Sequence, residues 1–454
     1  MFAMMGMTSC GHSGPSDPID AVPAGARRVT VIDLDRLVKA NGVATLSGGD
    51  GLQPGAEEAL GMFFPGDLLR PLAAILSKGG KGVDTSEAVV FTAPNGYTGV
   101  ILKVTDRDIL ATTLLPYRDE AADFGKYDAY TTGRRLIALS DALCVIAPDA
   151  ATVKLTGSDK GDDRLISRMS GVRQFLSSDD PIRSACPATE VFGKKMDGLW
   201  LCASLRFGDS SVTADLSAMR PDGEIAPIGN RVAGEIDPAA VSFVPAGSSL
   251  VIASGLQEDD AKLLGVEELV KRYFPGDVTM SRSGTTLWYA RPGGTITADN
   301  LLSPRVWNFA GVIQMPQRDG DRAVSNMQQM TGGTARLDPL TGCYTYTEGE
   351  ATMTYGYVDG YFVQSANGPV SFGLFNPFTE DFRGARVCAI IDIPSESSLR
   401  RACALPCGAS LTAKVTTDNI HAKLSFYGNP TPVLSTINSI PMLRDILPFI
   451  TGSK

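Results

Sequence analysis

Short segments of this sequence recur in the same order in its two halves, and this repetition constrains the possible folds more than any other feature. The pairs are VPAG at residues 22–25 and 244–247, FPGD at 64–67 and 274–277, and YTTG at 130–133 with YTEG at 346–349. Ordered pairs at nearly one separation, roughly 210–220 residues, are typical of a duplicated unit. We therefore expect two tandem, diverged copies of one domain, at residues 21–235 and 236–454, following a leader at residues 1–20.

The apolar pattern predicts the same kinds of element in each copy. In the first copy the run 28–33 predicts a strand, and 34–40, closed by Asn41-Gly42, predicts a helix. Each copy closes on a predicted two-stranded ribbon, 199–207 with 212–218 and 410–416 with 420–427. Strands and helices mix without strict alternation, which favours an α+β fold with largely antiparallel sheets and flanking helices. Residues 433–450 are apolar at helical spacing, and we expect this C-terminal helical segment to pack on the second copy's sheet; a helix that docks a partner is the alternative.

Charge and hydropathy exclude some partners. Hydrophobic residues make up 43% of the 454, the formal net charge is −9, and the sequence contains no long run of Lys or Arg. A polyanion partner requires a basic surface, so nucleic acid is not expected. No stretch of about 18 apolar residues is present. A link to a membrane would therefore have to be covalent.

The N-terminal segment suggests such a link. An apolar run ends in Met7-Thr8-Ser9-Cys10 and is followed by a polar tether. This order resembles a bacterial lipobox, in which a signal peptide is cleaved before a cysteine that then receives acyl chains. We expect Cys10 to carry the anchor, with a disordered cytosolic leader as the alternative.

The lipobox-like cysteine, the tether, the VPAG opening and its second occurrence resemble the secreted lipoproteins of unknown function from Bacteroidales. The resemblance implies an exported outer-membrane lipoprotein, on the periplasmic or cell-surface side of the cell envelope, with a duplicated α+β body. It supplies no catalytic residues.

Histidine content argues against several kinds of catalytic and metal site. The chain has only His12, in the tether, and His421, on a predicted strand. A two-histidine metal motif cannot form within one chain, and no G-x-S-x-G segment supplies a serine nucleophile. We predict no catalytic, metal or cofactor site, and a structural role for His421.

The cysteines suggest at most one local bridge. Cys403 and Cys407 are close in sequence, but their spacing is not that of a C-x-x-C redox motif. A disulfide between them in an oxidising compartment and two free thiols are both compatible with the sequence. Cys144, Cys202 and Cys388 fall in apolar strands, where buried thiols behave as small hydrophobic groups.

A tyrosine-rich hairpin is the candidate ligand contact. Tyr355 and Tyr357 share one face of a predicted strand, and Tyr361 follows the turn. We expect these rings to contribute to a ligand groove between the two copies. The alternative is that they form the core face of the second copy.

These observations favour a non-catalytic envelope protein that binds a protein or a glycan, or that serves in assembly. The alternative is a carboxylate-dependent hydrolase of the cell envelope, since two acidic side chains facing one cleft would suffice for that chemistry.

Overall fold

The fold is known from a computed structural model. It describes residues 15–440 except 49–50, 94, 120–126, 159–163, 167–168, 189, 192–193, 232, 257–283, 291–308, 350, 367–377, 397–399, 402–403 and 429–430.

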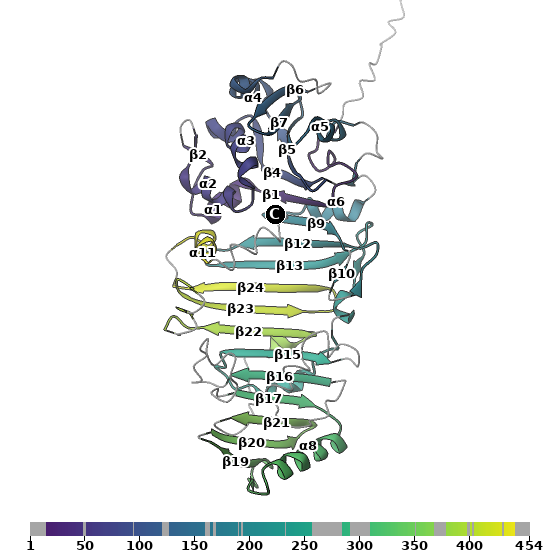
Figure 1. Ribbon diagram of the computed structural model, residues 1–454, viewed down its shortest axis with the longest axis vertical. Helices are drawn as coiled ribbons and strands as arrows, with labels where there is room; N and C mark the ends of the chain where they lie inside the picture. The colour runs from purple at the N-terminus through teal and green to yellow at the C-terminus, as the bar shows by residue number, and fades with distance from the viewer. Residues whose placement is uncertain are drawn as a thin grey trace, which may run out of the picture.

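One long antiparallel sheet runs along the molecule (Figure 1). In sheet order its strands are β6 (Asp128–Thr132), β7 (Arg135–Leu139), β8 (Leu143–Ala147), β5 (Thr98–Val104), β4 (Val83–Thr92), β1 (Arg28–Ile32), β9 (Ile182–Pro187), β12 (Trp200–Phe207), β13 (Ser211–Met219), β24 (Asn419–Tyr427), β23 (Gly408–Val415), β22 (Val387–Ile393), β15 (Leu250–Leu256), β16 (Gly284–Ala290), β17 (Phe309–Gln314), β21 (Tyr361–Ala366), β20 (Ala351–Val358), β19 (Tyr344–Glu348) and β18 (Arg336–Leu337). Every neighbouring pair is antiparallel.

Helices flank both faces of this sheet, so the predicted α+β class is confirmed. They are α1 (Leu34–Ala40), α2 (Pro54–Gly61), α3 (Gly66–Leu76), α4 (Arg107–Leu114), α5 (Ala150–Thr156), α6 (Ser170–Leu176), α8 (Gln317–Met330), α9 (Thr379–Phe382) and α11 (Val433–Ser439). Shorter elements are the ribbons β2 (Ser47–Gly48) with β3 (Gly51–Leu52) and β10 (Glu190–Val191) with β11 (Lys194–Lys195), the strand β14 (Ile225–Ala226) beside β13, and the 3-10 turns Ser77–Gly80, Leu115–Tyr117, Ile228–Arg231 and Pro238–Phe243.

Local sequence accounts for several of these elements. Helix α1 forms where it was predicted, because the Asp33 carboxylate accepts a hydrogen bond from the Arg36 amide and satisfies the first turn. Asp106 caps α4 in the same way. The two predicted ribbons are confirmed as β12–β13 and β23–β24.

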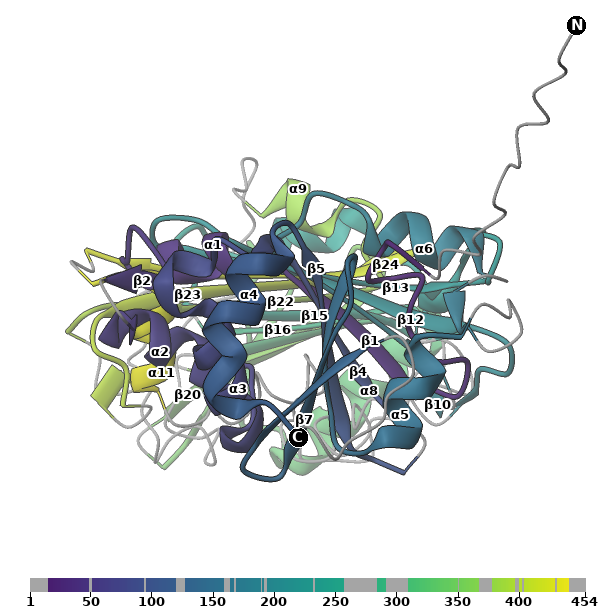
Figure 2. The same ribbon diagram turned by 90° about the horizontal axis from the view of Figure 1, so that it is seen from above.

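The first half of the sheet, from β6 to β13, has a core on each face. Alternate residues of β4 point to opposite sides, so that Val90 faces α1–α4 and Val89 faces α5 and α6. Helices α1, α2 and α11 gather on the side away from α5 and α6, as the view along the sheet shows (Figure 2). Two buried layers of mainly aliphatic side chains, one on each face, therefore hold the helices on this half of the sheet.

The second half, from β24 to β18, is also covered on both faces. Leu287 and Val363 belong to a core that includes the turn Pro238–Phe243 and Phe382 of α9. On the opposite face, Phe362 packs with residues of α8. Side-chain alternation along β16 and β21 again assigns successive residues to opposite layers.

The two halves join by strand pairing. β13 and β24 run side by side with Val212 opposite Leu424 and Ala214 opposite Ala422. The backbone ladder therefore passes from one half to the other without a break, and the halves meet edge to edge.

The C-terminal helix differs from its prediction. We expected residues 433–450 to pack on the second sheet, but Val433, Leu434 and Ile437 of α11 are buried in the core of the first half. Asn438 also donates a hydrogen bond to Glu58 of α2, at 2.7 Å. The apolar face of α11 was identifiable from the sequence, but the pattern did not specify which sheet it would cover. Residues 441–450 lie outside the described residues.

Candidate functional site

A cleft of about 750 Å³ opens where the first half meets the segment leading into α11. Its walls come from α1, the loop before β9, the turn between β12 and β13, and residues 432–433. Charged residues of both signs line it: Arg36, Lys39, Arg206, Asp179, Asp180 and Asp209. Phe207 and Val433 add apolar surface. Segments far apart in the sequence therefore combine into one charged recess.

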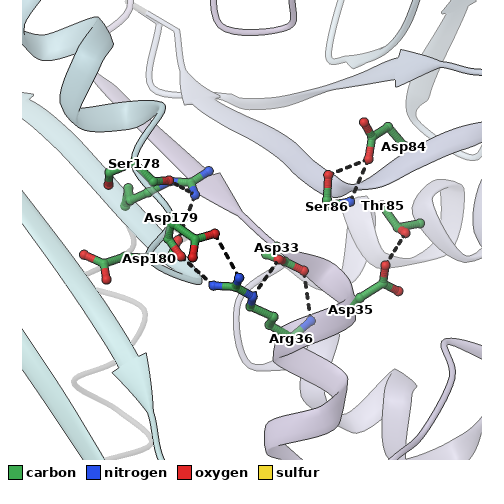
Figure 3. A network of polar contacts seen from close by, with 10 residues as sticks. Asp33, Asp35, Arg36, Asp84, Thr85, Ser86, Ser178, Asp179 and Asp180 are labelled. Carbon is green, nitrogen blue, oxygen red and sulfur yellow. Dashed lines mark hydrogen bonds and ion pairs between the residues drawn. The ribbon is translucent and has the colours of Figure 1, made fainter.

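Helix α1 supplies one wall. Its buried Leu34, Leu37 and Val38 hold the helix on the sheet, while Arg36 and Lys39, three residues apart, lie on the outer face. The Asp35 carboxylate accepts a hydrogen bond from the Thr85 hydroxyl at 2.6 Å, which ties α1 to β4 (Figure 3). The buried residues and the Asp35 contact thus fix how α1 is seated on the sheet, which leaves Arg36 and Lys39 facing outward.

The end of α1 approaches the C-terminal segment closely. Gly42 follows the helix with a φ of 75°, which favours glycine. A Cβ at this position would lie 2.5 Å from Cγ of Pro432, closer than real contacts allow. Gly42 therefore permits the close approach that completes the cleft.

Arg36 bridges α1 and the loop before β9. Its Nη2 lies 2.9 Å from Oδ1 of Asp179 and its Nε lies 3.3 Å from Oδ2 of Asp33 (Figure 3). The Asp179 side chain is almost fully exposed, so this pair contributes little to the free energy of unfolding. Its main effect is to hold the guanidinium at the rim of the cleft.

Arg206 connects the cleft with the junction between the halves. Its guanidinium pairs with Asp180, at 3.5 Å, and with Asp215. Asp215 in turn contacts Nδ1 of His421 at 2.7 Å across the β13–β24 pair. His421 thus has a structural partner, which the sequence could not reveal because the two residues lie on strands from different halves.

Two charged side chains of the cleft remain available to a ligand. Lys39 and Asp209 are exposed, and neither has an ion-pair or hydrogen-bond partner within the part of the chain that the structure describes. The three cationic and three anionic groups of the cleft balance in formal charge. Such a site suits a ligand with both charges better than a polyanion.

The predicted tyrosine site lies elsewhere. β20, which carries Tyr355 and Tyr357, is separated from β24 by seven strand spacings, or about 34 Å at about 4.8 Å each. The structure therefore does not bring the tyrosine hairpin to the junction of the halves or to the cleft.

Each of the three tyrosines packs within the second half. Tyr355 is buried and stacks on Tyr344 with ring centroids 5.5 Å apart. Tyr357 is half-buried and donates a hydrogen bond to the Met315 carbonyl at 2.8 Å. Tyr361 is buried and donates to Oδ2 of Asp237 at 2.6 Å; burial and this hydrogen bond raise the pKa of its phenol. The rings of Tyr355 and Tyr361 could meet a ligand only if the hairpin left its packing.

The structure describes some of the cysteines for which predictions were made. Burial raises the pKa values of Cys144, Cys202 and Cys388 to about 12, so these thiols are unreactive at neutral pH. Cys407 is a half-buried free thiol. Cys403 and Cys10 lie outside the described residues, and the proposed acylation stays a prediction.

Two further properties bear on function. Across the described ranges, no group of three or more His, Cys, Asp or Glu side chains has a geometry that could hold a metal ion. No helix in the same ranges is both long enough and apolar enough to cross a bilayer.

Three comparisons with known proteins were made. A scan against protein-family models, a search of curated proteins and a search of solved structures each find no match to this chain.

Proposed function

We propose that this chain is a non-catalytic binding protein of a bacterial cell envelope, an outer-membrane lipoprotein anchored through Cys10, and that its cleft docks a segment of a partner protein. The observation that carries the proposal is the pair of unpartnered, opposite charges, Lys39 and Asp209, in one recess within the described part of the chain. Lys39 would donate to a carboxylate of the partner, and Asp209 would accept from an ammonium or guanidinium group. The apolar surface of Phe207 and Val433 would contact the intervening side chains.

We also propose that the body consists of two diverged copies, residues 21–235 and 236–454. Strand order supports this proposal. Counting outward from the junction, the first half reads β13, β12, β9, β1, β4, β5, β8, β7, β6, and the second reads β24, β23, β22, β15, β16, β17, β21, β20, β19. In both halves the chain also fills these nine places in the same order, beginning with β1 in the first half and with β15 in the second.

A shared order of this kind is unusual for unrelated domains, because nine strands allow many sheet orders. The VPAG segments also precede corresponding strands, β1 and β15. Duplication accounts for both correspondences at once.

The placement of carboxylates favours binding over hydrolysis. Burial and the charge of Asp17 raise the pKa of Glu87 on β4, and burial raises the pKa of Asp381 beside Lys414 of β23. Strands β4 and β23 are six spacings apart, about 29 Å at about 4.8 Å each, so the two groups cannot act on one bond. In the cleft, Asp179 and Asp180 are each paired with an arginine.

Crosslinking in living cells tests the docking proposal. A photoreactive amino acid in place of Ala40, which lines the cleft, is expected to give a discrete protein adduct. The same probe at the exposed Leu155 of α5 serves as the positional control. The double variant Lys39→Glu/Asp209→Lys should reduce the Ala40 adduct at least tenfold, whereas Lys154→Glu/Asp418→Lys, at exposed positions outside the cleft, should not. An Ala40 adduct that survives the cleft variant contradicts the proposal.

The anchor is tested separately. Wild-type protein should incorporate a labelled fatty acid and sediment with membranes, and Cys10→Ala should do neither. Incorporation that persists in Cys10→Ala would exclude that residue as the acylation site. Because the cleft variants leave Cys10 intact, failure of one half of the proposal does not affect the other.

A further inference from the structure

Arg183 of β9 is a buried cation that contacts one wall of the cleft from inside the protein. It is only 7% exposed and is not among the residues that line the cleft. Its Nη1 donates hydrogen bonds to the backbone carbonyls of Ser178, at 2.5 Å, and Asp180, at 2.8 Å. Both carbonyls belong to the loop between α6 and β9, which forms that wall. The guanidinium therefore holds the loop from its inner side.

Arg36 holds the same loop from the side of the cleft. Its Nη1 donates to the backbone carbonyl of Asp179, and its Nη2 donates to the Asp179 carboxylate at 2.9 Å (Figure 3). The carbonyls of three consecutive residues, 178–180, thus each accept a hydrogen bond from an arginine. Of the two arginines, only Arg183 is buried, so its contacts are shielded from water and from any ligand in the cleft.

The position of this loop decides which charges of the cleft are neutralised. Asp179 occupies both terminal nitrogens of Arg36, one through its carbonyl and one through its carboxylate. Asp180 lies 3.5 Å from Nη1 of Arg206. Two of the three cations that line the cleft are therefore paired with carboxylates of the loop.

Withdrawal of the loop would make the cleft basic. The three cations of the lining would remain, and Asp209 would be the one carboxylate left among its six charged residues, so the formal charge of the lining would change from zero to +2. Asp33 and Asp215, which lie outside the loop, would still contact one nitrogen of each arginine. The nitrogens now bound to the loop would become available to an acidic ligand.

Support of α6 is a second role that the same contacts would explain. The Ser178 carbonyl lies just beyond the C-terminal end of α6, where a cation is favourable. That role alone predicts that loss of Arg183 lowers stability. It predicts no change in the kind of ligand that the cleft prefers, so the two roles can be separated by measuring that preference.

We propose that Arg183 is a positioning residue that determines the charge preference of the cleft. By holding residues 178–180 it keeps Arg36 and Arg206 paired, so that the cleft selects a segment carrying both charges over an acidic one. The inference rests on the proposed docking function and extends it to the charge of the partner segment.

The test is a gain of binding in Arg183→Met. Fluorescence anisotropy is measured on the full chain with two labelled peptides of equal length, hexaglutamate and an alternating Lys-Glu peptide. At low ionic strength Arg183→Met should bind hexaglutamate about fivefold more tightly than the wild type, the upper range for one exposed ion pair. The gain should disappear at high salt. Because the substitution removes a positive charge, a general electrostatic effect would act in the opposite direction, and so would partial unfolding.

Two control variants bracket this result. Arg135→Met removes another buried arginine of the first half, one that contacts Asp67 and does not line the cleft. It should lower the Tm and leave the peptide preference unchanged. Asp179→Asn/Asp180→Asn removes the loop carboxylates directly and should reproduce the gain for hexaglutamate without loss of the Arg183 contacts.

A milder variant protects the test against misfolding. Arg183→Lys keeps the buried charge but lacks the planar guanidinium, and should give a smaller gain in the same direction. The inference is overturned if Arg183→Met, or Arg183→Lys where the first variant does not fold, binds hexaglutamate no more tightly than Arg135→Met does. The photocrosslink at Ala40 in the wild type reports on the docking proposal separately, so a failure of either one is recognised independently of the other.

Discussion

Asp215 and His421 face each other across the junction of the two halves, with Oδ1 and Nδ1 2.7 Å apart although 206 residues separate them in sequence. The contact exists because β13 and β24 pair directly. Arg206 extends it to the rim of the cleft through its ion pairs with Asp215 and Asp180. The candidate cleft of the first half is therefore connected to a residue of the second through the ion pairs of Arg206 and the hydrogen bond between Asp215 and His421.

Helix α11 is expected to stabilise the first half rather than the second. Leu434→Ala should lower the free energy of unfolding by about 2–4 kcal/mol, because Leu434 is fully buried in the first-half core and its truncation leaves a cavity. Hydrogen exchange should rise in α1 and α2. Leu340→Ala, at a 94% exposed position, should change neither quantity. Faster exchange confined to β15–β17 would contradict the observed packing.

The ion pair between Asp67 of α3 and Arg135 of β7 should contribute to the stability of the first half. The Arg135 side chain is buried, its Nε lies 2.9 Å from Oδ2 of Asp67, and its Nη1 donates to the Thr98 carbonyl at 2.7 Å. Asp67→Asn should cost about 2 kcal/mol, because it leaves a buried cation without its partner. In an Arg135→Met background the same change should cost much less. Equal costs in both backgrounds, measured by urea unfolding, would show that the pair is not coupled.

Gly320 should be intolerant of a side chain although it lies inside α8. A Cβ there would be 2.0 Å from the Tyr357 ring. Gly320→Ala should therefore destabilise the protein by about 1–3 kcal/mol, despite the better helix propensity of alanine. Ser325→Ala, on the exposed face of the same helix, should be neutral or slightly stabilising. Thermal unfolding of the two variants decides between helix propensity and packing.

Glu87 should make stability depend on pH. Burial, with a smaller contribution from Asp17, raises the pKa of its carboxyl above the unfolded value near 4.5. The folded state therefore binds the proton more tightly, and the associated stability is present below pH 4.5 and lost as the pH rises through the folded pKa. Glu87→Gln should remove this loss and be relatively more stable at pH 7. The exposed Glu57→Gln is the control, and identical pH profiles for wild type and Glu87→Gln would disprove the assignment.

The cleft was not predicted from the sequence, although its parts were visible there. Arg36 and Lys39 lie on a helix whose range and C-terminal end were both predicted. Arg206 lies on a predicted strand. Nothing in the sequence placed α1, the β12–β13 turn and residue 432 together, because those contacts join segments whose local patterns are independent of one another.

The sequence by itself determined the local elements: the α1 helix ending at Asn41-Gly42, the β12–β13 and β23–β24 ribbons, and hence the α+β class. Such elements depend on residues only a few positions apart, whose period and capping groups can be read directly. Only the tertiary structure decided that β13 pairs with β24, that α11 crosses to the first half, and that Tyr355 is buried. An apolar face requires burial but does not specify its partner, and strand edges can pair with any edge of matching register. Those choices were settled by packing over the whole chain.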